Sequence, residues 1–295
     1  MHRTRRHGLL AINVASLIFG SAALFGRLPV STVWVVAGRS GLAAITLAAV
    51  CALTQRWRPL PAALRPWLVA SGVMLAAHWL AFYGSIQQAG IAVGTVTFAT
   101  FPLFTLLVES IRRRQRPSPI HVGAAVTIVL AIAWLFGVPE AGVDRWGIVA
   151  GLSSAVLYAL YWHVSRPLAK TLPDAWSAVL QNAVVCAVTA PIALMQAGIP
   201  ASPRVWWGLL WLGTVNTAVG LVLYQRALRF LDTTTCSAFI ALEPVYAILL
   251  ARLLLNEPAP ARTLVAGALI VAASLAMLKH DAGGSLPSST PDCSR

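Results

Sequence analysis

The sequence predicts an all-α integral membrane protein with ten transmembrane helices, arranged as two inverted repeats of five helices each. Three observations support this fold class. Hydrophobic residues make up 58% of the 295 residues and charged residues 11%, whereas a soluble domain carries about 25% charged residues. The apolar residues are gathered into runs that are long enough to cross a bilayer. The second half of the chain also repeats the pattern of the first half.

The apolar runs are bounded by Arg, Pro and Gly residues, and each approaches the roughly 20 residues that a helix needs to cross the hydrocarbon core. The loops between the runs are short, so consecutive helices are expected to run antiparallel. We predict spans at residues 8–26, 32–53, 67–86, 92–111, 120–138, 146–164, 175–196, 205–228, 234–255 and 263–279.

The two ends of the chain differ in character. The basic N-terminus resembles the start of a signal peptide, but the apolar run continues to Phe25 without a small-x-small cleavage site. We therefore expect an uncleaved first span. Residues 281–295 are polar and rich in Ser, Pro and Gly, a composition that predicts a disordered cytoplasmic tail.

The basic residues predict the orientation. The formal net charge is +13, but the arginines lie between apolar runs and not along one helix face, which argues against a nucleic-acid partner. Most of the 22 Lys and Arg residues fall in loops on the side of the N-terminus. This bias predicts a multi-pass protein of the cell inner membrane with both termini in the cytoplasm. The four cysteines show no metal-ligand spacing, so neither a metal site nor a cofactor is predicted.

The two halves match at a nearly constant offset. The segment ATFPLFTLLVESI at 99–111 resembles ALEPVYAILLARL at 241–253, with Pro102 matching Pro244. We divide the chain into a first repeat at 1–138, a second repeat at 139–280 and the tail at 281–295. Five spans per repeat is an odd number, so the second repeat must enter the membrane in the opposite sense. Inverted repeats are a transporter architecture, with the binding site near the midplane between the repeats.

Several motifs resemble those of one family. They are Arg39-x-x-x-Ala43 in the second span and, in the second half, Glu243-Pro244, Glu257 and Gly267. Over essentially its full length the chain resembles the EamA-type permeases of the drug/metabolite transporter superfamily. The resemblance implies two inverted five-helix bundles, alternating access and a central cavity lined mainly by spans one, three, four, six, eight and nine.

Amino-acid exporters of the YddG type are the most similar group within that superfamily. Phe101, before the proline of the fourth span, and the pair Tyr161 and Trp162 in the sixth span fall where the cavity aromatics of that type are expected. Phe101 stands where that type is expected to carry Trp.

Helical spacing gives candidate substrate-binding residues. Polar, aromatic and Gly residues share one stripe of several spans, and such a stripe belongs toward protein or a cavity because lipid favours neither hydroxyl groups nor voids. Aromatic faces accept apolar side chains and attract ammonium groups, while a few polar groups orient the solute. The candidates from spacing are His78, Phe82, Tyr83, Tyr158, Trp162, Asn216, Tyr224, Phe239 and Glu243, and the resemblance adds Phe101.

Three charged or titratable candidates have two interpretations each. Glu243, in mid-span beside Pro244, could exchange protons during transport or accept hydrogen bonds from a neighbouring helix. His78 could relay a proton or join two helices. For Arg39 we favour snorkelling or a bond to a backbone carbonyl over a gate ion pair.

Other polar and small residues have structural interpretations. Gly147 and Gly151 form a GxxxG pattern that favours close helix packing. His163 is interpreted as structural, and Glu109 as the partner of Arg112 and Arg113 in a surface pair.

The function predicted from the sequence is export of small metabolites, most of all aromatic or neutral amino acids, by an inner-membrane permease with alternating access. The alternative is a multidrug or quaternary-cation proton antiporter, although the first span lacks the acidic residue expected there. The chain carries no HExxH, GxSxG or Walker motif, so we predict neither an enzyme nor an ATP-driven pump. A structural scaffold would not need the stripe of aromatic and hydroxyl groups. The expected partners are a small-molecule substrate and the lipid bilayer, and the expected state is a monomer.

Overall fold

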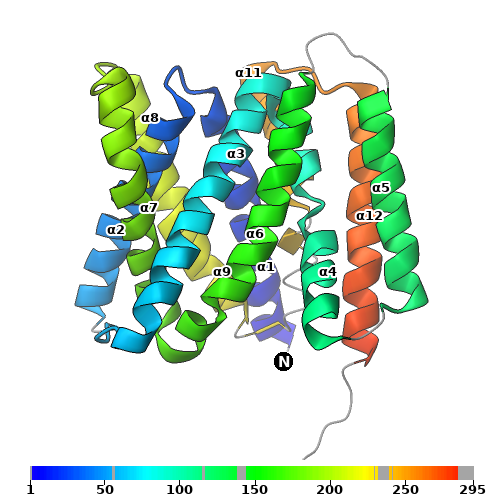
Figure 1. Ribbon diagram of the computed structural model, residues 1–295, viewed down its shortest axis with the longest axis horizontal. Helices are drawn as coiled ribbons and strands as arrows, with labels where there is room; N and C mark the ends of the chain where they lie inside the picture. Colours follow the sequence, from blue (N-terminus) through cyan, green and yellow to red (C-terminus); the bar gives the residue numbers. More distant parts are fainter. Residues whose placement is uncertain are drawn as a thin grey trace, which may run out of the picture.

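The computed structural model describes residues 2–54, 57–114, 117–137, 144–228, 230–231, 239–240 and 242–284. All the secondary structure within these ranges is helical, and the helices stand side by side in one bundle (Figure 1). They are α1 (His2–Ser21), η1 (Ala22–Arg27), α2 (Thr32–Leu53), η2 (Ala62–Leu64), α3 (Arg65–Phe98), α4 (Phe101–Arg113), α5 (Pro119–Gly137), α6 (Arg145–Thr171), α7 (Asp174–Ala197), α8 (Pro203–Trp211), η3 (Leu212–Val219), α9 (Gly220–Leu228), α11 (Glu243–Leu255) and α12 (Ala261–Gly284).

Five helical stretches in the described residues are long and apolar enough to cross a membrane. They are Arg6–Arg27, Thr32–Leu53, Ala62–Phe98, Arg145–Thr171 and Asp174–Gln196. Shorter apolar helices cover Pro119–Trp134 and Ala261–Met277. The integral-membrane class is therefore supported, while the count of ten spans stays a prediction. The tail was predicted to be disordered from residue 281, but α12 continues to Gly284. Residues 285–295 and part of the ninth predicted span lie outside the described residues.

The third and fourth predicted spans differ from expectation. We predicted a loop after residue 86 and one continuous helix from 92 to 111. Instead α3 continues to Phe98, with a break at Gly90, whose φ of 92° is open to glycine but costly for other residues. The chain leaves the helix at Ala99 and Thr100 and begins α4 at Phe101. Pro102 explains the second break, because proline has no N–H and its ring clashes with the preceding helical turn.

The second half has a related break. There α11 begins at Glu243 with Pro244 as its second residue, as α4 begins at Phe101 with Pro102. Both helices also end on a residue with left-handed backbone, Arg114 after α4 and Asn256 after α11. The eighth predicted span contains a further irregularity, since its middle third, η3, is a π-helix.

Equivalent helices of the two halves pack against each other in two places. The start of α2 packs on the end of α7, where Trp34 meets Ala193, and the end of α2 packs on the start of α7, where Cys51 meets Val179. These two helices are therefore antiparallel, and so are α5 and α12, which lie together at one side of the bundle (Figure 1).

Two further kinds of helix pair correspond when the halves are exchanged. Helix α3 packs against α6 as α9 packs against α1, and α4 packs against α6 as α11 packs against α1. The largest buried cluster centres on α3 and includes Leu75, Trp79, Tyr83 and Ile86 together with Ala247 of α11. The core therefore lies where the two halves meet.

Candidate functional site

An aromatic cluster occupies the centre of the bundle. Tyr158 of α6 lies 4.7 Å from the His78 ring of α3 between centroids, and 5.4 Å from the Phe101 ring of α4. The Phe98 ring lies 5.1 Å from His78 and 5.4 Å from Phe101. We define the aromatic cluster as His78, Phe82, Tyr83, Phe98, Phe101, Tyr158, Tyr161 and Trp162, which are joined by ring contacts.

The structure therefore brings six of the predicted site residues together. They are His78, Phe82, Tyr83, Phe101, Tyr158 and Trp162. Phe98 belongs to the same cluster, but the sequence did not single it out, because it lies at the broken end of α3 and outside the stripe of a regular helix. Trp162 is 49% exposed, at the edge of the cluster.

Close packing of α3 on α6 positions these rings. A Cβ atom at Gly147 would overlap Ala89, and one at Gly151 would overlap Thr97. Both glycines are therefore needed for the close approach of the helices, which agrees with the packing interpretation of GxxxG.

His78 joins the same two helices. Its Nδ1 lies 3.0 Å from the Ser154 carbonyl oxygen and 2.8 Å from Ser154 Oγ. A carbonyl oxygen only accepts, so Nδ1 carries the proton in this arrangement. His78 is 4% exposed. This contact fits the interhelical interpretation of His78.

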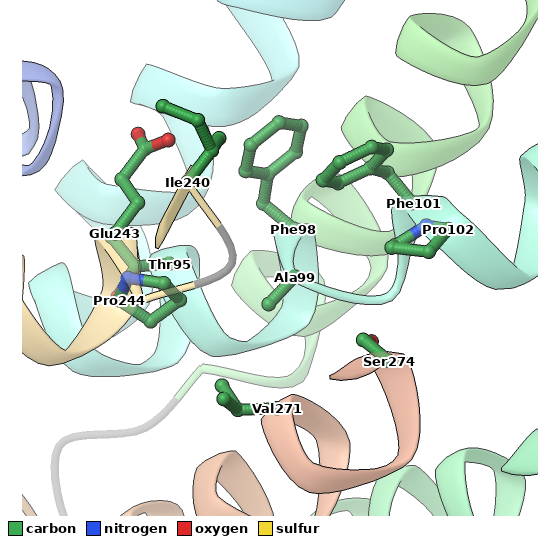
Figure 2. A pocket seen from close by; sticks show the side chains of 10 residues that line it. All are labelled: Thr95, Phe98, Ala99, Phe101, Pro102, Ile240, Glu243, Pro244, Val271 and Ser274. Atoms are coloured by element: carbon green, nitrogen blue, oxygen red, sulfur yellow. The ribbon is translucent and has the colours of Figure 1, made fainter. Parts of the chain in front are cut away.

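A small cavity lies next to the aromatic cluster, between the two broken helices. Its volume is about 20 Å³, enough for about one water molecule. In Figure 2 the starts of α4 and α11 flank it, and the Glu243 carboxylate extends from one side while the rings of Phe98 and Phe101 lie beside each other on the other. The lining residues are Thr95, Phe98, Ala99, Phe101, Pro102, Ile240, Glu243, Pro244, Val271 and Ser274.

Three predicted site residues contact α1 instead. Asn216, in η3, is buried and donates from Nδ2 to the Ile18 carbonyl and, at 2.8 Å, to Ser21 Oγ. Tyr224 and Phe239 pack against a buried cluster of Ala11, Ile12 and Ala227. These contacts give all three residues a role in attaching α1 to the second half of the chain.

The partners of Arg39 are side chains, whereas we favoured snorkelling or a bond to a backbone carbonyl. Its Nη1 donates to the Tyr83 hydroxyl at 2.8 Å, and its guanidinium lies 4.1 Å from the centre of the Trp79 ring. The Nε atom is buried and has no hydrogen-bond partner within the described part of the chain. Among the same residues, no carboxylate oxygen lies within 4.0 Å of Arg39.

Two carboxylates form ion pairs between the halves, and the sequence reasoning missed this role for both. The first group, which we name the Glu257 clamp, contains Arg27, Ile91 and Glu257. Arg27 Nε lies 2.8 Å from Glu257 Oε2. Glu257 Oε1 accepts a hydrogen bond of 2.7 Å from the Ile91 N–H, directly after the break at Gly90. The carboxylate thus replaces the helical partner that the break removes.

The second group, the Glu109 clamp, contains Glu109 of α4 with His163 and Arg166 of α6. Glu109 Oε2 lies 3.0 Å from His163 Nε2 and 3.1 Å from Arg166 Nη2. The predicted pairing with Arg112 is present, but our interpretation of Glu109 as only a surface pair was wrong, because the carboxylate also holds α6. The side chain of Arg113 lies outside the described residues.

The clamps lie at opposite ends of the bundle. Gly147, at the start of α6, packs next to the Gly90 break, at Ala89, so this end of α6 lies near the Glu257 clamp. His163 and Arg166 lie towards the other end of the same helix. Figure 1 agrees, with α11 labelled near the top of the view and α4 in the lower half.

Comparison with known proteins identifies the family. The EamA-like transporter family matches residues 6–137 and again 145–279. The chain is 24% identical over 185 residues to "Uncharacterized transporter YxxF" of Bacillus subtilis, covering 62% of this chain and 60% of that protein. It is 25% identical over 196 residues to "Uncharacterized transporter YwfM" of the same organism, covering 65% and 66%.

These alignments span less than two thirds of the length of the curated relatives. A crystal structure of a protein with 18% identity superposes with a TM-score of 0.65, covering 96% of this chain and all of that one. This similarity concerns the fold alone. Because the family matches in two consecutive copies that together cover most of the sequence, the chain belongs to the EamA-like transporter family, within the drug/metabolite transporter superfamily.

Proposed function

We propose that the chain is a permease of the cell inner membrane that exports small metabolites, most of all aromatic and neutral amino acids, by alternating access. The observation that carries this proposal is the small cavity that Glu243 lines. The cavity lies between α4 and α11, each of which begins in the middle of a predicted span, and it adjoins the aromatic cluster. Broken helices around a central site are typical of secondary transporters.

The chemistry of this centre favours a small amphipathic solute. Ring faces pack against apolar side chains and attract an ammonium group. The Glu243 carboxylate supplies the anionic group of a mainly apolar lining that also contains Thr95 and Ser274, and a carboxylate suits the same ammonium group. The predicted binding residues of the aromatic cluster, together with Glu243, would form this site. Asn216, Tyr224 and Phe239 would then act through α1.

The architecture proposed for this function is a pair of inverted five-helix repeats, divided near residue 138, with ten spans in all. The antiparallel pairs α2–α7 and α5–α12 support it, because an inverted two-fold relation requires equivalent helices to run in opposite senses. The exchange of partners between α3–α6 and α9–α1 supports it too. A monomer with both termini in the cytoplasm completes the proposal.

Two features of the described conformation limit access to the centre. The cavity of about 20 Å³ is too small for an amino acid, and the Glu257 and Glu109 clamps are both formed. In alternating access one clamp would open while the other stays closed, so that the centre faces one side at a time.

Counterflow in proteoliposomes tests this function. Vesicles loaded with one unlabelled amino acid should accumulate the same labelled amino acid, and a panel of neutral, aromatic, acidic and basic amino acids should give highest exchange for the aromatic and neutral members. A bifunctional maleimide that joins cysteines introduced at positions 27 and 257, or at positions 109 and 166, should stop exchange in either case. Exchange that persists with one end cross-linked would contradict alternating access.

The alternative substrate class is a quaternary ammonium cation, because a carboxylate beside aromatic rings also suits such a group. The same vesicles decide between the classes. Uptake of a labelled tetraalkylammonium ion that is driven by an outward proton gradient, without exchange of any amino acid, would favour the antiporter.

A further inference from the structure

We propose that Arg39 and Glu243 bind the two ends of a zwitterionic substrate, Arg39 its carboxylate and Glu243 its ammonium group. This inference rests on the proposed function and specifies the substrate class: an α-amino acid with both charged groups free. Arg39 was not among the predicted site residues.

Arg39 has donor capacity that its partners among the described residues leave unused. A guanidinium carries five N–H donors, and the one hydrogen bond that the structure assigns to it goes to the neutral Tyr83 hydroxyl. The buried Nε has no partner within the described ranges. A positive charge within a membrane span is costly unless it is paired, and the Trp79 ring compensates only part of that cost. A substrate carboxylate matches the planar fork of the guanidinium and would complete its pairing.

Glu243 presents the complementary charge. Its side chain lines the cavity and extends away from Pro244 in Figure 2. The described residues provide it with neither an ion pair within 4.0 Å nor a side-chain hydrogen bond. As the first residue of α11 it lies at the positive end of the helix, which stabilises its negative charge without neutralising it.

The aromatic cluster connects the two charged groups. Tyr83 accepts the hydrogen bond from Arg39, its ring centroid lies 5.3 Å from that of Phe82, and the Phe82 centroid lies 5.4 Å from that of Phe98. Phe98 and Glu243 both line the cavity, whereas Arg39 is not among the lining residues. Within the described part of the chain the two charged groups form no ion pair within 4.0 Å, so a gap wider than a direct contact separates them. A zwitterion would fill the gap with its head group while its side chain meets the rings of the aromatic cluster.

This arrangement also relates binding to transport. When the empty site opens to water, the charges of Arg39 and Glu243 are hydrated. When the site closes without a substrate, both charges lose water and gain no ionic partner. A zwitterion neutralises both charges at once and so stabilises the closed conformation relative to the open ones. Only a ligand that binds one conformation better shifts such an equilibrium.

Competition against labelled phenylalanine exchange in proteoliposomes tests the inference with the unaltered chain. The first competitor, phenylalanine, carries both charges. Phenylalanine amide and 2-phenylethylamine carry the ammonium group alone, and 3-phenylpropionate carries the carboxylate alone. We expect phenylalanine to compete at least tenfold more strongly than each of the others. Equal competition by the amide would overturn the role of the carboxylate, whether or not any variant folds.

Variants assign the partners. Arg39→Gln should lower phenylalanine exchange at least tenfold, while 2-phenylethylamine should compete as strongly as it does with the unaltered chain. Arg39→Lys should lower phenylalanine exchange less than Arg39→Gln because it retains the positive charge. Glu243→Gln should abolish competition by the amine. Arg252→Gln is the matched control, since Arg252 is exposed on α11, and it should behave as the unaltered chain.

The failures of the two proposals are distinguishable. If the unaltered chain exchanges no amino acid, the proposed function fails and this inference fails with it. If the unaltered chain exchanges amino acids but Arg39→Gln does so at the same rate, the function stands and the inference is overturned.

Discussion

The Glu257 clamp gives the sharpest test of how the two halves are held together. Replacing Glu257 with Ala removes two interactions at once. One is the ion pair to Arg27, and the other is the acceptor for the Ile91 N–H. Replacing Glu257 with Gln removes the negative charge but leaves an oxygen that can still accept from Ile91. The pair of variants therefore separates the charge from the hydrogen bond.

The two contributions differ in size. Arg27 is partly exposed, with 38% of its side chain accessible, so the ion pair contributes at most about 1 kcal/mol. Ile91 is fully buried in the closed conformation, and a buried N–H without an acceptor costs about 1–3 kcal/mol. Water can pair with this N–H once the end opens, so the cost falls on the closed conformation. Glu257→Ala should shift the equilibrium towards opening by about 1–4 kcal/mol, or about 5-fold to 1000-fold.

Cysteine labelling measures this shift. Ala251 of α11 is 3% exposed and packs in the same cluster as Ala22 of η1, so a cysteine there should react only when this end opens. With the native cysteines replaced by serine, Ala251→Cys should react with a membrane-impermeant maleimide more than about fivefold faster beside Glu257→Ala, and less than about fivefold faster beside Glu257→Gln.

The Glu109 clamp supplies the control for this experiment. Glu109→Ala weakens the opposite end and should not increase labelling at Ala251. Equal labelling in Glu257→Ala and Glu257→Gln would refute the role of the Ile91 hydrogen bond. Equal acceleration by Glu109→Ala would refute the assignment of the clamps to separate ends.

Three further variants test local features. Gly90→Ala should lower the thermal unfolding temperature in detergent, because Gly90 has a φ of 92° and a Cβ would lie 2.8 Å from a clamp carboxylate oxygen; Gly84→Ala, whose Cβ would have no neighbour within 4 Å, should not lower it. Gly151→Ala should destabilise the protein by about 1–3 kcal/mol in reversible denaturation, because its methyl group would overlap Thr97. Trp162→Ala should alter the ranking of amino acids in the exchange panel at unchanged yield of folded protein, whereas lower yield with unchanged ranking would indicate packing alone.

The sequence predicted those contacts of the aromatic cluster that follow helical spacing. His78 and Phe82 share a stripe of α3, Tyr158 and Trp162 share one of α6, and these stripes meet because both helices are regular where the residues lie. Phe98 escaped prediction for the opposite reason. It follows the irregular backbone at Gly90 and precedes the break at Thr100, so helical periodicity does not describe its direction.

The clamps could not be found from local pattern. Arg27 and Glu257 are 230 residues apart, and neither lies on a stripe that points to the other. A signal was nevertheless present in the repeat, since Arg27 follows the first span as Arg166 follows the aromatic part of the sixth span. Such an equivalence predicts similar roles, but it does not identify which acidic residue is the partner, because Glu109 and Glu257 occupy different positions in their repeats.

The helix break at Gly90 and the Glu257 clamp are structurally coupled. In a membrane, every backbone polar group released by a break must find another partner. At Gly90 that partner comes from the other half of the chain, since Glu257 caps the N-terminus of the short segment Ile91–Phe98. The same segment ends with Phe98 at the cavity. Opening the clamp therefore releases a helical segment about 12 Å long whose far end bears a ring of the site. Glu257→Ala should consequently weaken amino-acid competition as well as accelerate labelling at Ala251. A surface ion pair acting only at its own end would change the labelling alone.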